Sequence, residues 1–331
     1  MALGMLVEGE WKTWRQQEDE EGSFVRPETS FRDFVTADGS SGFETEEGRY
    51  HLYVSWACPW AHRTAIMRKL KGLEDVVSLS ATHPVMGEEG WIFSDTLGAI
   101  PDFVNGANYL HEVYTEADPN YTGRVTTPVL WDKKETTIVN NESREIVRML
   151  DTEFGDFAKR DVDFYPEDLR EEIELTLDEL YEPVNNGVYR TGFATEQSAY
   201  EGAVTELFDA LDRWEGVLSV RRYLCGDRIT EADWAFFTTL VRFDPVYHGH
   251  FKCNLRRIAD YPNLWGYLKD LYQQPGVAET VDLDHIKRHY YVSHDSINTT
   301  GIVPKGPAVD LREPHDRERL SGWGRRERAV Y

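Results

Sequence analysis

Cysteine, lysine and long apolar runs are all scarce in this chain of 331 residues. Its three cysteines are widely spaced and form neither a disulfide framework nor a zinc-ligand pattern. No apolar run approaches the length of a membrane span, and the N-terminus lacks the apolar core of a signal peptide. These absences predict a soluble protein of the cytoplasm whose thiols stay reduced.

Positive charge is under-represented as well. The 36 basic residues, only 10 of them lysine, stand against 59 Asp and Glu, so the formal net charge is -23. A field of this sign repels nucleic acid and anionic membranes, and we expect neither as a partner. An ordinary acidic protein would have this balance. A halophilic protein would have it too, because at molar salt the Debye length is about 3 Å and the repulsion between surface carboxylates is screened. Acidic, lysine-poor surfaces resemble those of haloarchaeal proteins, and we favour that origin.

The length suggests two domains. Residues 1–48 are polar and irregular and are predicted to form an extended N-terminal arm. In residues 49–160 the pattern is β-α-β and then β-β-α, the order of a thioredoxin-like domain, with a long insertion at about 83–123 that we expect to be functional. The predicted strands are 50–56, 76–81, 125–131 and 137–139, and the predicted helices are 58–70 and 142–150.

Residues 161–292 are predicted to form an all-helical domain. Apolar side chains recur at helical spacing over 169–184 and 200–214, and a further helix is expected near 264–272. The stretch 234–241 is apolar nearly all round and should be a buried central helix, with Thr230 and Asp233 as its capping signal. Residues 293–331 contain Gly and Pro and are predicted to be a coil tail.

Cys58 joins a predicted strand to a predicted helix. Pro59 suits the first helical position, where its missing N–H would have no partner. A thiol at a helix N-terminus faces free backbone N–H groups and the positive end of the helix dipole, which stabilise the thiolate form that attacks sulfur. Two interpretations follow from this segment alone: a reactive thiolate, or a half-buried cysteine that packs against its tryptophan neighbours.

A β-α-β unit followed by a helical domain is the plan of the glutathione transferases, and several phrases narrow the resemblance. The segment from Trp56 to Arg63, which reads WACPWAHR, resembles the active-site phrase of the Xi class, the glutathionyl-hydroquinone reductases. The resemblance spans about 49–307, and further matching segments are 90–93, 123–132, 141–143, 186–189, 289–291 and 300–304. It implies an α/β thioredoxin-like domain followed by an all-α glutathione transferase C-terminal domain.

The resemblance also implies a mechanism. Ala61 stands where a dithiol oxidoreductase has its second cysteine, so a second thiol from solution must resolve any mixed disulfide on Cys58. Cys58 would attack the sulfur of a glutathionyl-hydroquinone, release the hydroquinone and form a mixed disulfide with glutathione. The implied co-substrate is glutathione, or γ-glutamylcysteine in a haloarchaeal host. No metal or flavin motif is present, and we expect neither cofactor.

The thiol-binding residues follow from the same resemblance. Pro128 matches the cis-proline of the thioredoxin superfamily, and the backbone from Val125 to Thr127 would pair with the cysteinyl part of glutathione. Glu142 and Ser143 begin a helix and would hold the γ-glutamyl group, although an ordinary helix cap is the simpler interpretation of this pair. Further expected contacts are Trp91, which would pack on glutathione, and Arg124, which lies beside the backbone-pairing segment.

Tyr189 and Tyr290 match positions at which the family places tyrosines around the hydroquinone, and they are predicted to act there as catalytic residues. Tyrosine offers a flat ring face and a hydroxyl for the phenolic oxygen. The neighbouring Tyr291 is an alternative to Tyr290. His62 lies one turn after Cys58; it could tune the thiolate or simply be a solvated helix residue. The resemblance further implies a homodimer.

Two other functions remain open. A conjugating glutathione transferase uses serine or tyrosine to hold the glutathione thiolate, and the cysteine at position 58 argues against it. A non-catalytic binding protein of the same fold is disfavoured by the complete active-site phrase and would be favoured by an inert Cys58.

Overall fold

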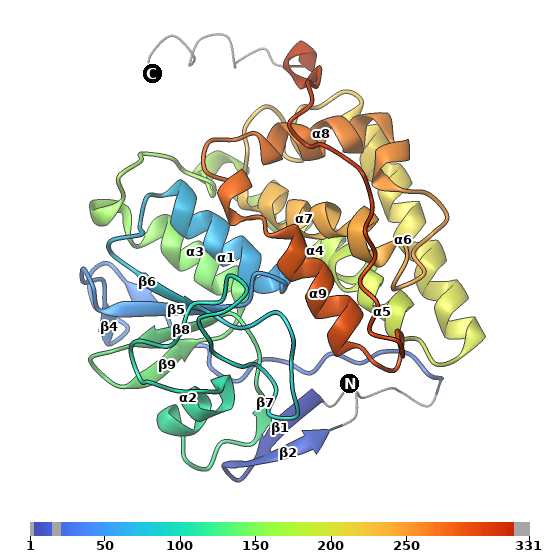
Figure 1. Ribbon diagram of the computed structural model, residues 1–331. Helices are drawn as coiled ribbons and strands as arrows, with labels where there is room; N and C mark the ends of the chain where they lie inside the picture. The colour runs from blue at the N-terminus through green and yellow to red at the C-terminus, as the bar shows by residue number, and fades with distance from the viewer. Residues whose placement is uncertain (1–2, 15–20, 321–331) are drawn as a thin grey trace. The chain divides into compact units, whose positions relative to one another are not determined.

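The computed structural model describes residues 3–14 and 21–320, which divide by their contacts into two compact units (Figure 1). The described part of the first unit comprises 3–14, Arg26–Val162 and Glu279–Pro304. That of the second comprises 21–25, Asp163–Ala278 and 305–320. None of the described helices combines the length and the apolar character needed to span a bilayer.

A four-stranded mixed sheet with strand order β6-β5-β8-β9 forms the centre of the first unit. Strand β5 runs parallel to β6 and antiparallel to β8, with Tyr53 opposite Val129. This is the predicted thioredoxin-like order. The strands are β5 (Tyr50–Val54), β6 (Ser78–Ala81), β8 (Val129–Asp132) and β9 (Thr137–Asn140).

Helices cover both faces of this sheet (Figure 1). Helices α1 (Pro59–Leu70) and α3 (Ser143–Thr152) lie side by side on one face, and α2 (Leu110–Ala117) lies on the other. Because side chains alternate along a strand, every second strand residue points to the α2 side. Tyr53, Trp131 and Ile138 pack there with α2 in one buried cluster.

The segment predicted as an extended arm folds back on itself in its first part. Strands β1 (Leu3–Val7) and β2 (Glu10–Trp14) form an antiparallel hairpin, and β1 also pairs with β7 (Gly123–Arg124), placing Met5 opposite Arg124. A short parallel pair follows, β3 (Val35–Thr36) with β4 (Phe43–Glu44). Residues 1–2 and 15–20 of the predicted arm lie outside the described residues.

Just before β3, the same segment runs along β9. The backbone of Asp33 donates to Val139 O, and Asn141 donates to Phe31 O, both through backbone N–H groups. The Arg32 side chain pairs with Glu145 on α3. An otherwise open strand edge is therefore covered, which protects it from pairing with other chains.

The second unit is helical, as predicted. Thr230 and Asp233 form the expected capping box, and every residue of α7 is buried, as its all-round apolar pattern indicated. Segments of π-helix, Tyr181–Asn185 and Phe243–Tyr247, extend α4 and α7. The helices are α4 (Arg170–Leu180), α5 (Gly187–Phe193), α6 (Gln197–Leu218), α7 (Glu231–Arg242) and α8 (Pro262–Tyr272). Short 3₁₀ turns lie at Gly155–Phe157, Glu167–Leu169, Ile258–Asp260, Ala278–Thr280 and Arg317–Leu320.

Helix α9 (Leu283–Ser293) groups with the first unit, whereas the predicted helical domain extended to residue 292. The reason is a set of hydrogen bonds to the thioredoxin-like part. His289 Nδ1 lies 2.9 Å from Pro84 O, and Ser293 Oγ accepts from the backbone N–H of Met86. The chain returns to the first unit after leaving it, a feature that helical periodicity does not encode.

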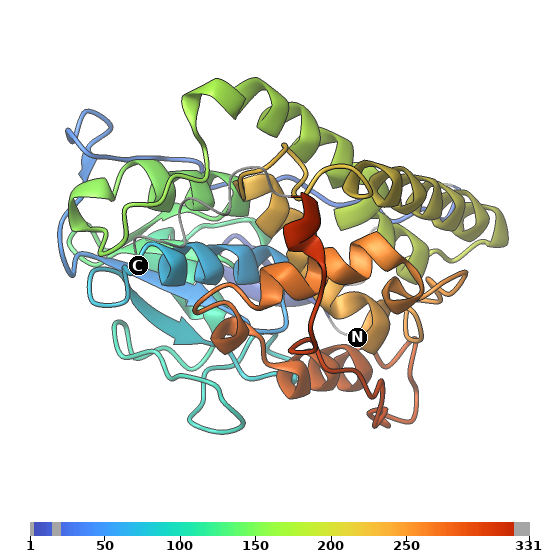
Figure 2. The same ribbon diagram turned by 90° about the horizontal axis from the view of Figure 1, so that it is seen from above.

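The stretch 305–320, which we call the C-terminal strap, passes across α8 (Figures 1 and 2). Lys269 Nζ donates to Pro314 O, and the Gln273 amide donates to Leu311 O and Glu313 O. The predicted coil tail is therefore ordered by side chains of α8 over this stretch, and residues 321–331 lie outside the described part.

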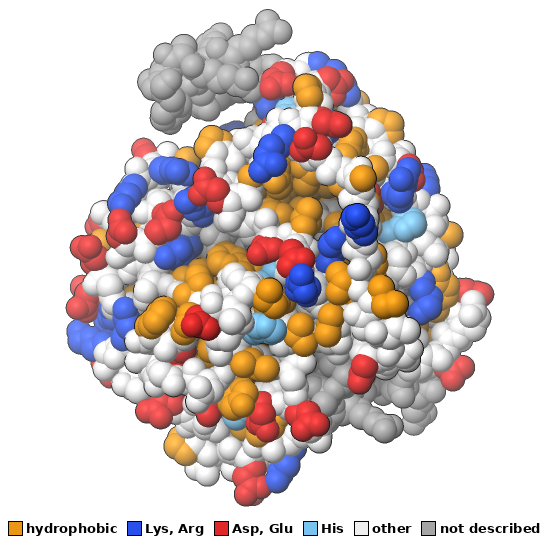
Figure 3. Space-filling view, in the orientation of Figure 1, with side chains coloured by type: hydrophobic (Ala, Val, Ile, Leu, Met, Phe, Trp, Pro, Cys, Tyr) orange, Lys and Arg blue, Asp and Glu red, His pale blue; other side chains and the backbone are white. Residues whose placement is uncertain are grey.

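Charges of both signs are interspersed on the face shown in Figure 3. Several arginines form ion pairs whose members are about half exposed, such as Arg213 with Glu179 and Arg256 with Asp212. Exposed pairs of this kind contribute about 0–1 kcal/mol each. Local pairing therefore adds little stability, and it leaves the net charge of -23 unchanged.

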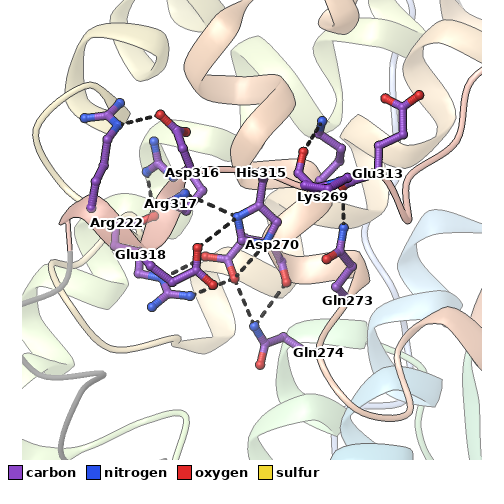
Figure 4. Close-up of polar contacts among 12 residues, drawn as sticks. Arg222, Lys269, Asp270, Gln273, Gln274, Glu313, His315, Asp316, Arg317 and Glu318 are labelled. Atoms are coloured by element: carbon purple, nitrogen blue, oxygen red, sulfur yellow. Dashed lines mark hydrogen bonds and ion pairs between the residues drawn. The ribbon is translucent and has the colours of Figure 1, made fainter.

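A buried ionic network holds the strap (Figure 4). Arg317 is fully buried and donates to the backbone carbonyl of Leu218, the last residue of α6, and to those of Arg221 and Arg222 just after the helix. The Arg222 guanidinium binds Asp270 on α8 through two hydrogen bonds of 2.8 and 2.9 Å. Cations at a helix C-terminus satisfy its unpaired carbonyls and interact favourably with the dipole.

Candidate active site

Cys58 is the N-cap of α1, with Pro59 in the first turn as the sequence predicted. Its backbone has extended dihedral angles, its carbonyl accepts from the N–H of His62, and its side chain is partly exposed. Cys58 Sγ lies 3.5 Å from Thr127 O. The thiol therefore stands at the positive end of a helix and beside a backbone carbonyl at the end of the predicted pairing segment.

The Thr127–Pro128 peptide bond is cis, as the resemblance implied. It falls between β7 and β8, and the strand predicted over 125–131 begins only at Val129. Proline has no N–H for a sheet ladder, which agrees with a strand that starts directly after Pro128. Val125 is buried, and Arg124 belongs to β7.

Tyr114 on α2 connects the predicted pairing segment to the turn between β9 and α3. Its buried hydroxyl donates to Thr126 O and accepts from the backbone N–H of Thr126 and from Asn141 Nδ2. Burial raises the pKa of Tyr114 to about 12, so the hydroxyl keeps its proton and remains a donor. Nothing in the sequence separated Tyr114 from the other sixteen tyrosines.

Glu142 and Ser143 begin α3, as predicted. Glu142 is the N-cap, and its Oε1 accepts from the backbone N–H of Arg144 and from the Ser143 hydroxyl. The other carboxylate oxygen is 3.5 Å from the hydroxyl of Thr29. The helix-cap interpretation is therefore correct for the structure, and the partly exposed carboxylate still lies at the helix start, where an ammonium group could approach it.

A second guanidinium, that of Arg26, lies near Arg124 and was not predicted. Burial and, to a smaller extent, the charge of Arg26 lower the pKa of Arg124 to about 10. Arg26 also lies over the ring of Trp60, 5.1 Å from its centroid. The Arg124 guanidinium stays charged at neutral pH, and a region with two arginine side chains favours a carboxylate ligand.

Trp91 and Tyr290 are brought into one aromatic group by α9. The rings of Trp91 and His289 are stacked, with centroids 5.0 Å apart and planes 14° apart. The Tyr290 ring meets His289 and His294 edge to face. Tyr290 is 1% exposed and Tyr291 is 9% exposed, so neither presents an open ring face in this state.

His62 is buried and is not the solvated helix residue that one interpretation expected. Its Nε2 lies 2.9 Å from the hydroxyl of Thr280, which precedes α9 in the first unit. The imidazole therefore contributes to the attachment of the returning segment to α1.

Tyr189 lies on α5 and belongs to the second unit, whereas the other predicted site residues belong to the first. Within its own unit it belongs to an aromatic cluster with Phe193, Tyr247 and Phe251, at centroid distances between 5.5 and 6.2 Å. Its own side chain is partly exposed. Such a cluster offers flat apolar surface to an aromatic ring.

The two other cysteines are buried in the second unit. Burial raises the pKa of Cys225 to about 11 and raises that of Cys253 further. Both are therefore neutral thiols at physiological pH, and neutral thiols are poor nucleophiles. Cys58 alone among the three has a partly exposed side chain at a helix start.

Comparisons with known proteins agree with this architecture. Residues 57–153 match the glutathione S-transferase N-terminal domain, and residues 197–270 match the glutathione S-transferase C-terminal domain. The chain is 52% identical to glutathionyl-hydroquinone reductase YqjG of Escherichia coli, over 96% of this chain and 99% of that protein. It is 54% identical to glutathionyl-hydroquinone reductase PcpF of Sphingobium chlorophenolicum, over 93% and 98%.

Solved structures show the same relationship. An Xi class glutathione transferase from Natrialba magadii aligns with a TM-score of 0.91 and 54% identity, covering 97% of this chain and 98% of that one. Glutathione-bound YqjG from Escherichia coli aligns with a TM-score of 0.88 and 50% identity, covering 95% and 99%. The chain therefore belongs to the glutathione transferases, within the family of the Xi class and the glutathionyl-hydroquinone reductases.

Proposed function

We propose that this protein reduces glutathionyl-hydroquinones, with Cys58 as nucleophile. The observation that carries the proposal is the position of Cys58 at the start of α1, with its sulfur 3.5 Å from the carbonyl that precedes cis-Pro128. Relatives more than 50% identical over nearly the whole chain are named for this activity. Glutathione, or a γ-glutamyl thiol of the same kind, is the proposed co-substrate, and a reaction that consumes free thiol suits a reducing cytoplasm.

The reaction balances in two steps. The Cys58 thiolate attacks the sulfur of the aryl thioether, so that an S–S bond forms and the bond between sulfur and the ring carbon breaks. The ring carbon keeps the electron pair of that bond and takes up a proton, giving the hydroquinone. A second thiol then attacks the mixed disulfide as thiolate, which releases glutathione disulfide and restores the Cys58 thiolate. Two sulfurs are oxidised and one ring carbon is reduced.

The start of α1 supports the first step, because backbone N–H groups and the helix dipole favour a thiolate at the N-cap. Ala61 leaves Cys58 without a second cysteine in the active-site phrase, and both other cysteines are buried. We infer that the resolving thiol comes from solution. This separates the proposed cycle from an intramolecular dithiol cycle.

We propose that the thiol lies against the first unit. Backbone groups from Val125 to Thr127 would pair with its cysteinyl part, and Trp91 would pack on it. Glu142 would accept from the α-ammonium, and Ser143 with the first N–H groups of α3 would donate to the α-carboxylate. Arg124 would bind a carboxylate of the same molecule, supported by the positive charge of Arg26.

Tyr290 and Tyr189 are the proposed contacts of the hydroquinone. A tyrosine hydroxyl could donate the proton that the ring carbon takes up, because a phenol is a weak acid of suitable reach. Tyr290 is the direct sequence neighbour of His289, and the His289 ring stacks on Trp91. This position favours Tyr290 over Tyr291 as the contact of the hydroquinone. Its near-complete burial indicates that the side chain must move when a substrate binds.

The test of the proposed function is turnover of two matched substrates. A glutathionyl-hydroquinone and its γ-glutamylcysteinyl counterpart should each give free hydroquinone and the corresponding disulfide when their own thiol is supplied. The ratio of kcat/KM between them identifies the preferred thiol. Release of neither hydroquinone under excess thiol would refute the proposal.

Replacing Glu142 with alanine should weaken thiol binding. An ammonium left without its carboxylate costs about 2–5 kcal/mol when it is desolvated, and because Glu142 is partly exposed we expect about 2 kcal/mol, roughly thirtyfold in Kd. The measurement is calorimetric titration with S-methylglutathione. Glu142→Gln is the matched control, since it retains an acceptor for the Arg144 N–H but removes the charge, and it should lose most of the affinity without loss of stability. An unchanged Kd in both variants would place the γ-glutamyl group elsewhere.

We also propose a homodimer, on the resemblance to the family. Sedimentation at high salt should give twice the mass of one chain. A single species with the mass of one chain would exclude the dimer under those conditions.

The acidic surface leads to a proposal about salt. With 59 acidic and 36 basic residues, repulsion should destabilise the fold at low ionic strength, where the Debye length is about 30 Å at 0.01 M. The thermal midpoint should rise between 0.1 M and 2 M KCl, first by screening and then by stronger apolar burial. The Escherichia coli relative YqjG serves as the comparison and should gain much less. Equal midpoints at the two concentrations would contradict the halophilic interpretation.

A further inference from the structure

The side chain of Trp91 is held by a residue that has no place in the mechanism above. The His289 ring stacks on it with planes 14° apart and centroids 5.0 Å apart. The backbone of Trp91 is fixed separately, because its carbonyl accepts from the N–H of Leu110 at the start of α2. Trp91 is partly exposed, so the stack leaves part of its side chain open to solvent.

His289 is in turn fixed by a hydrogen bond. Its Nδ1 lies 2.9 Å from Pro84 O, and because a carbonyl oxygen can only accept, Nδ1 carries the proton. One turn later on the same face of α9, the Ser293 hydroxyl accepts from the backbone N–H of Met86. The two bonds attach α9 to the segment that leads to Trp91, and they set the plane of the imidazole.

We propose that His289 is a positioning residue that sets the plane of the Trp91 ring for thiol binding. The inference rests on the proposed role of Trp91 as the surface on which glutathione packs. Without the imidazole, the indole could rotate about its side-chain torsions, and thiol binding would have to restore its orientation. Because α9 also carries Tyr290, the same residue connects the proposed thiol subsite to the helix of a proposed hydroquinone contact.

Two substitutions at His289 test the stacking ring and the hydrogen-bond donor separately. His289→Asn places an amide N–H near the position of Nδ1, which keeps a donor for Pro84 O, but it removes the stacking ring. His289→Phe keeps a flat ring against Trp91 and removes the donor. If the stack positions Trp91, His289→Asn should weaken binding of S-methylglutathione about three- to tenfold, the range for one aromatic pair. His289→Phe should bind within about twofold of the wild type on the same scale.

Steady-state kinetics add a readout that general damage to the fold would not produce. With the glutathionyl-hydroquinone as substrate, His289→Asn should raise KM by the same factor as Kd, while kcat changes less than about threefold. Thermal melting identifies any variant that has lost its native fold. Should His289→Asn fail to fold, His289→Phe alone decides: weakened binding with a native melt would overturn the proposal.

A double-mutant cycle with Trp91→Ala tests whether His289 acts through Trp91. In the Trp91→Ala background, His289→Asn should have no further effect on S-methylglutathione binding. Independent, additive losses would overturn the inference and leave the proposed thiol subsite intact. Unchanged binding in Trp91→Ala alone would instead refute the role of Trp91, and with it this inference. Turnover of the glutathionyl-hydroquinone by the wild type tests the proposed activity separately.

Discussion

Cys58→Ser is expected to lose the release of hydroquinone, with kcat falling on the order of a thousandfold or more, as is usual when a covalent nucleophile is removed. A serine hydroxyl at the start of α1 is not ionised at neutral pH and cannot form the mixed disulfide. The measurement is hydroquinone formed per enzyme in excess glutathione, by chromatography. Serine can still hydrogen-bond a bound thiolate, so weak conjugating activity could emerge in this variant.

The controls for this variant are Cys225→Ala and Cys253→Ala. Both thiols are buried, and burial raises their pKa values, to about 11 for Cys225, so neither should contribute a thiolate. Both variants should keep turnover close to that of the wild type. Incubation of the wild type with glutathione disulfide should add one glutathionyl group, and peptide mapping should place it on Cys58. Full activity in Cys58→Ser would refute the mechanism.

The largest expected loss of stability comes from Asp270→Ala. The Asp270 and Arg222 side chains are 3% and 7% exposed and share two hydrogen bonds. Removing one member of a buried ion pair leaves the other charge without compensation and typically costs about 3–5 kcal/mol. Urea unfolding followed by tryptophan fluorescence at constant salt measures the change in the free energy of unfolding.

The matched control is Glu179→Ala, which breaks the half-exposed pair with Arg213 and should cost less than about 1 kcal/mol. A third variant, Arg222→Met combined with Asp270→Leu, replaces the pair with apolar side chains. It should be more stable than Asp270→Ala, because it leaves no buried charge that has lost its hydrogen-bonded carboxylate. If Asp270→Ala and Glu179→Ala cost the same, the buried network contributes no more than an exposed pair.

Much of the secondary structure in both units could be predicted from local patterns. Cys58 and Pro59 mark the start of α1 because a cap and a proline have clear positional preferences. The capping box at Thr230 and the buried α7 follow from spacing and apolar periodicity in the same way. The cis peptide bond at Pro128 could not be predicted from residue spacing, and its prediction came from the resemblance to the Xi class.

The residues that were missed are those whose partners are far away in the sequence. Arg26 lies near Arg124, Tyr114 contacts Asn141, and His289 stacks on Trp91, yet none of these side chains has a distinctive local setting. The hairpin that precedes them was missed because its partner strand, β7, is only two residues long and more than a hundred residues later. The roles of such residues depend on tertiary contacts. Hydrophobic periodicity and turn residues indicate local structure and do not predict those contacts.

The return of residues Glu279–Pro304 to the first unit has a consequence for biosynthesis. A ribosome adds about 5–20 residues per second, so α9 emerges on the order of ten seconds or more after the cis-Pro128 segment. During that interval the nascent first unit lacks Thr280, whose hydroxyl is the hydrogen-bond partner of His62. It also lacks His289, whose ring stacks on Trp91. The helical unit must be synthesised in between, so the proposed thiol subsite is completed only when nearly the whole chain has been made.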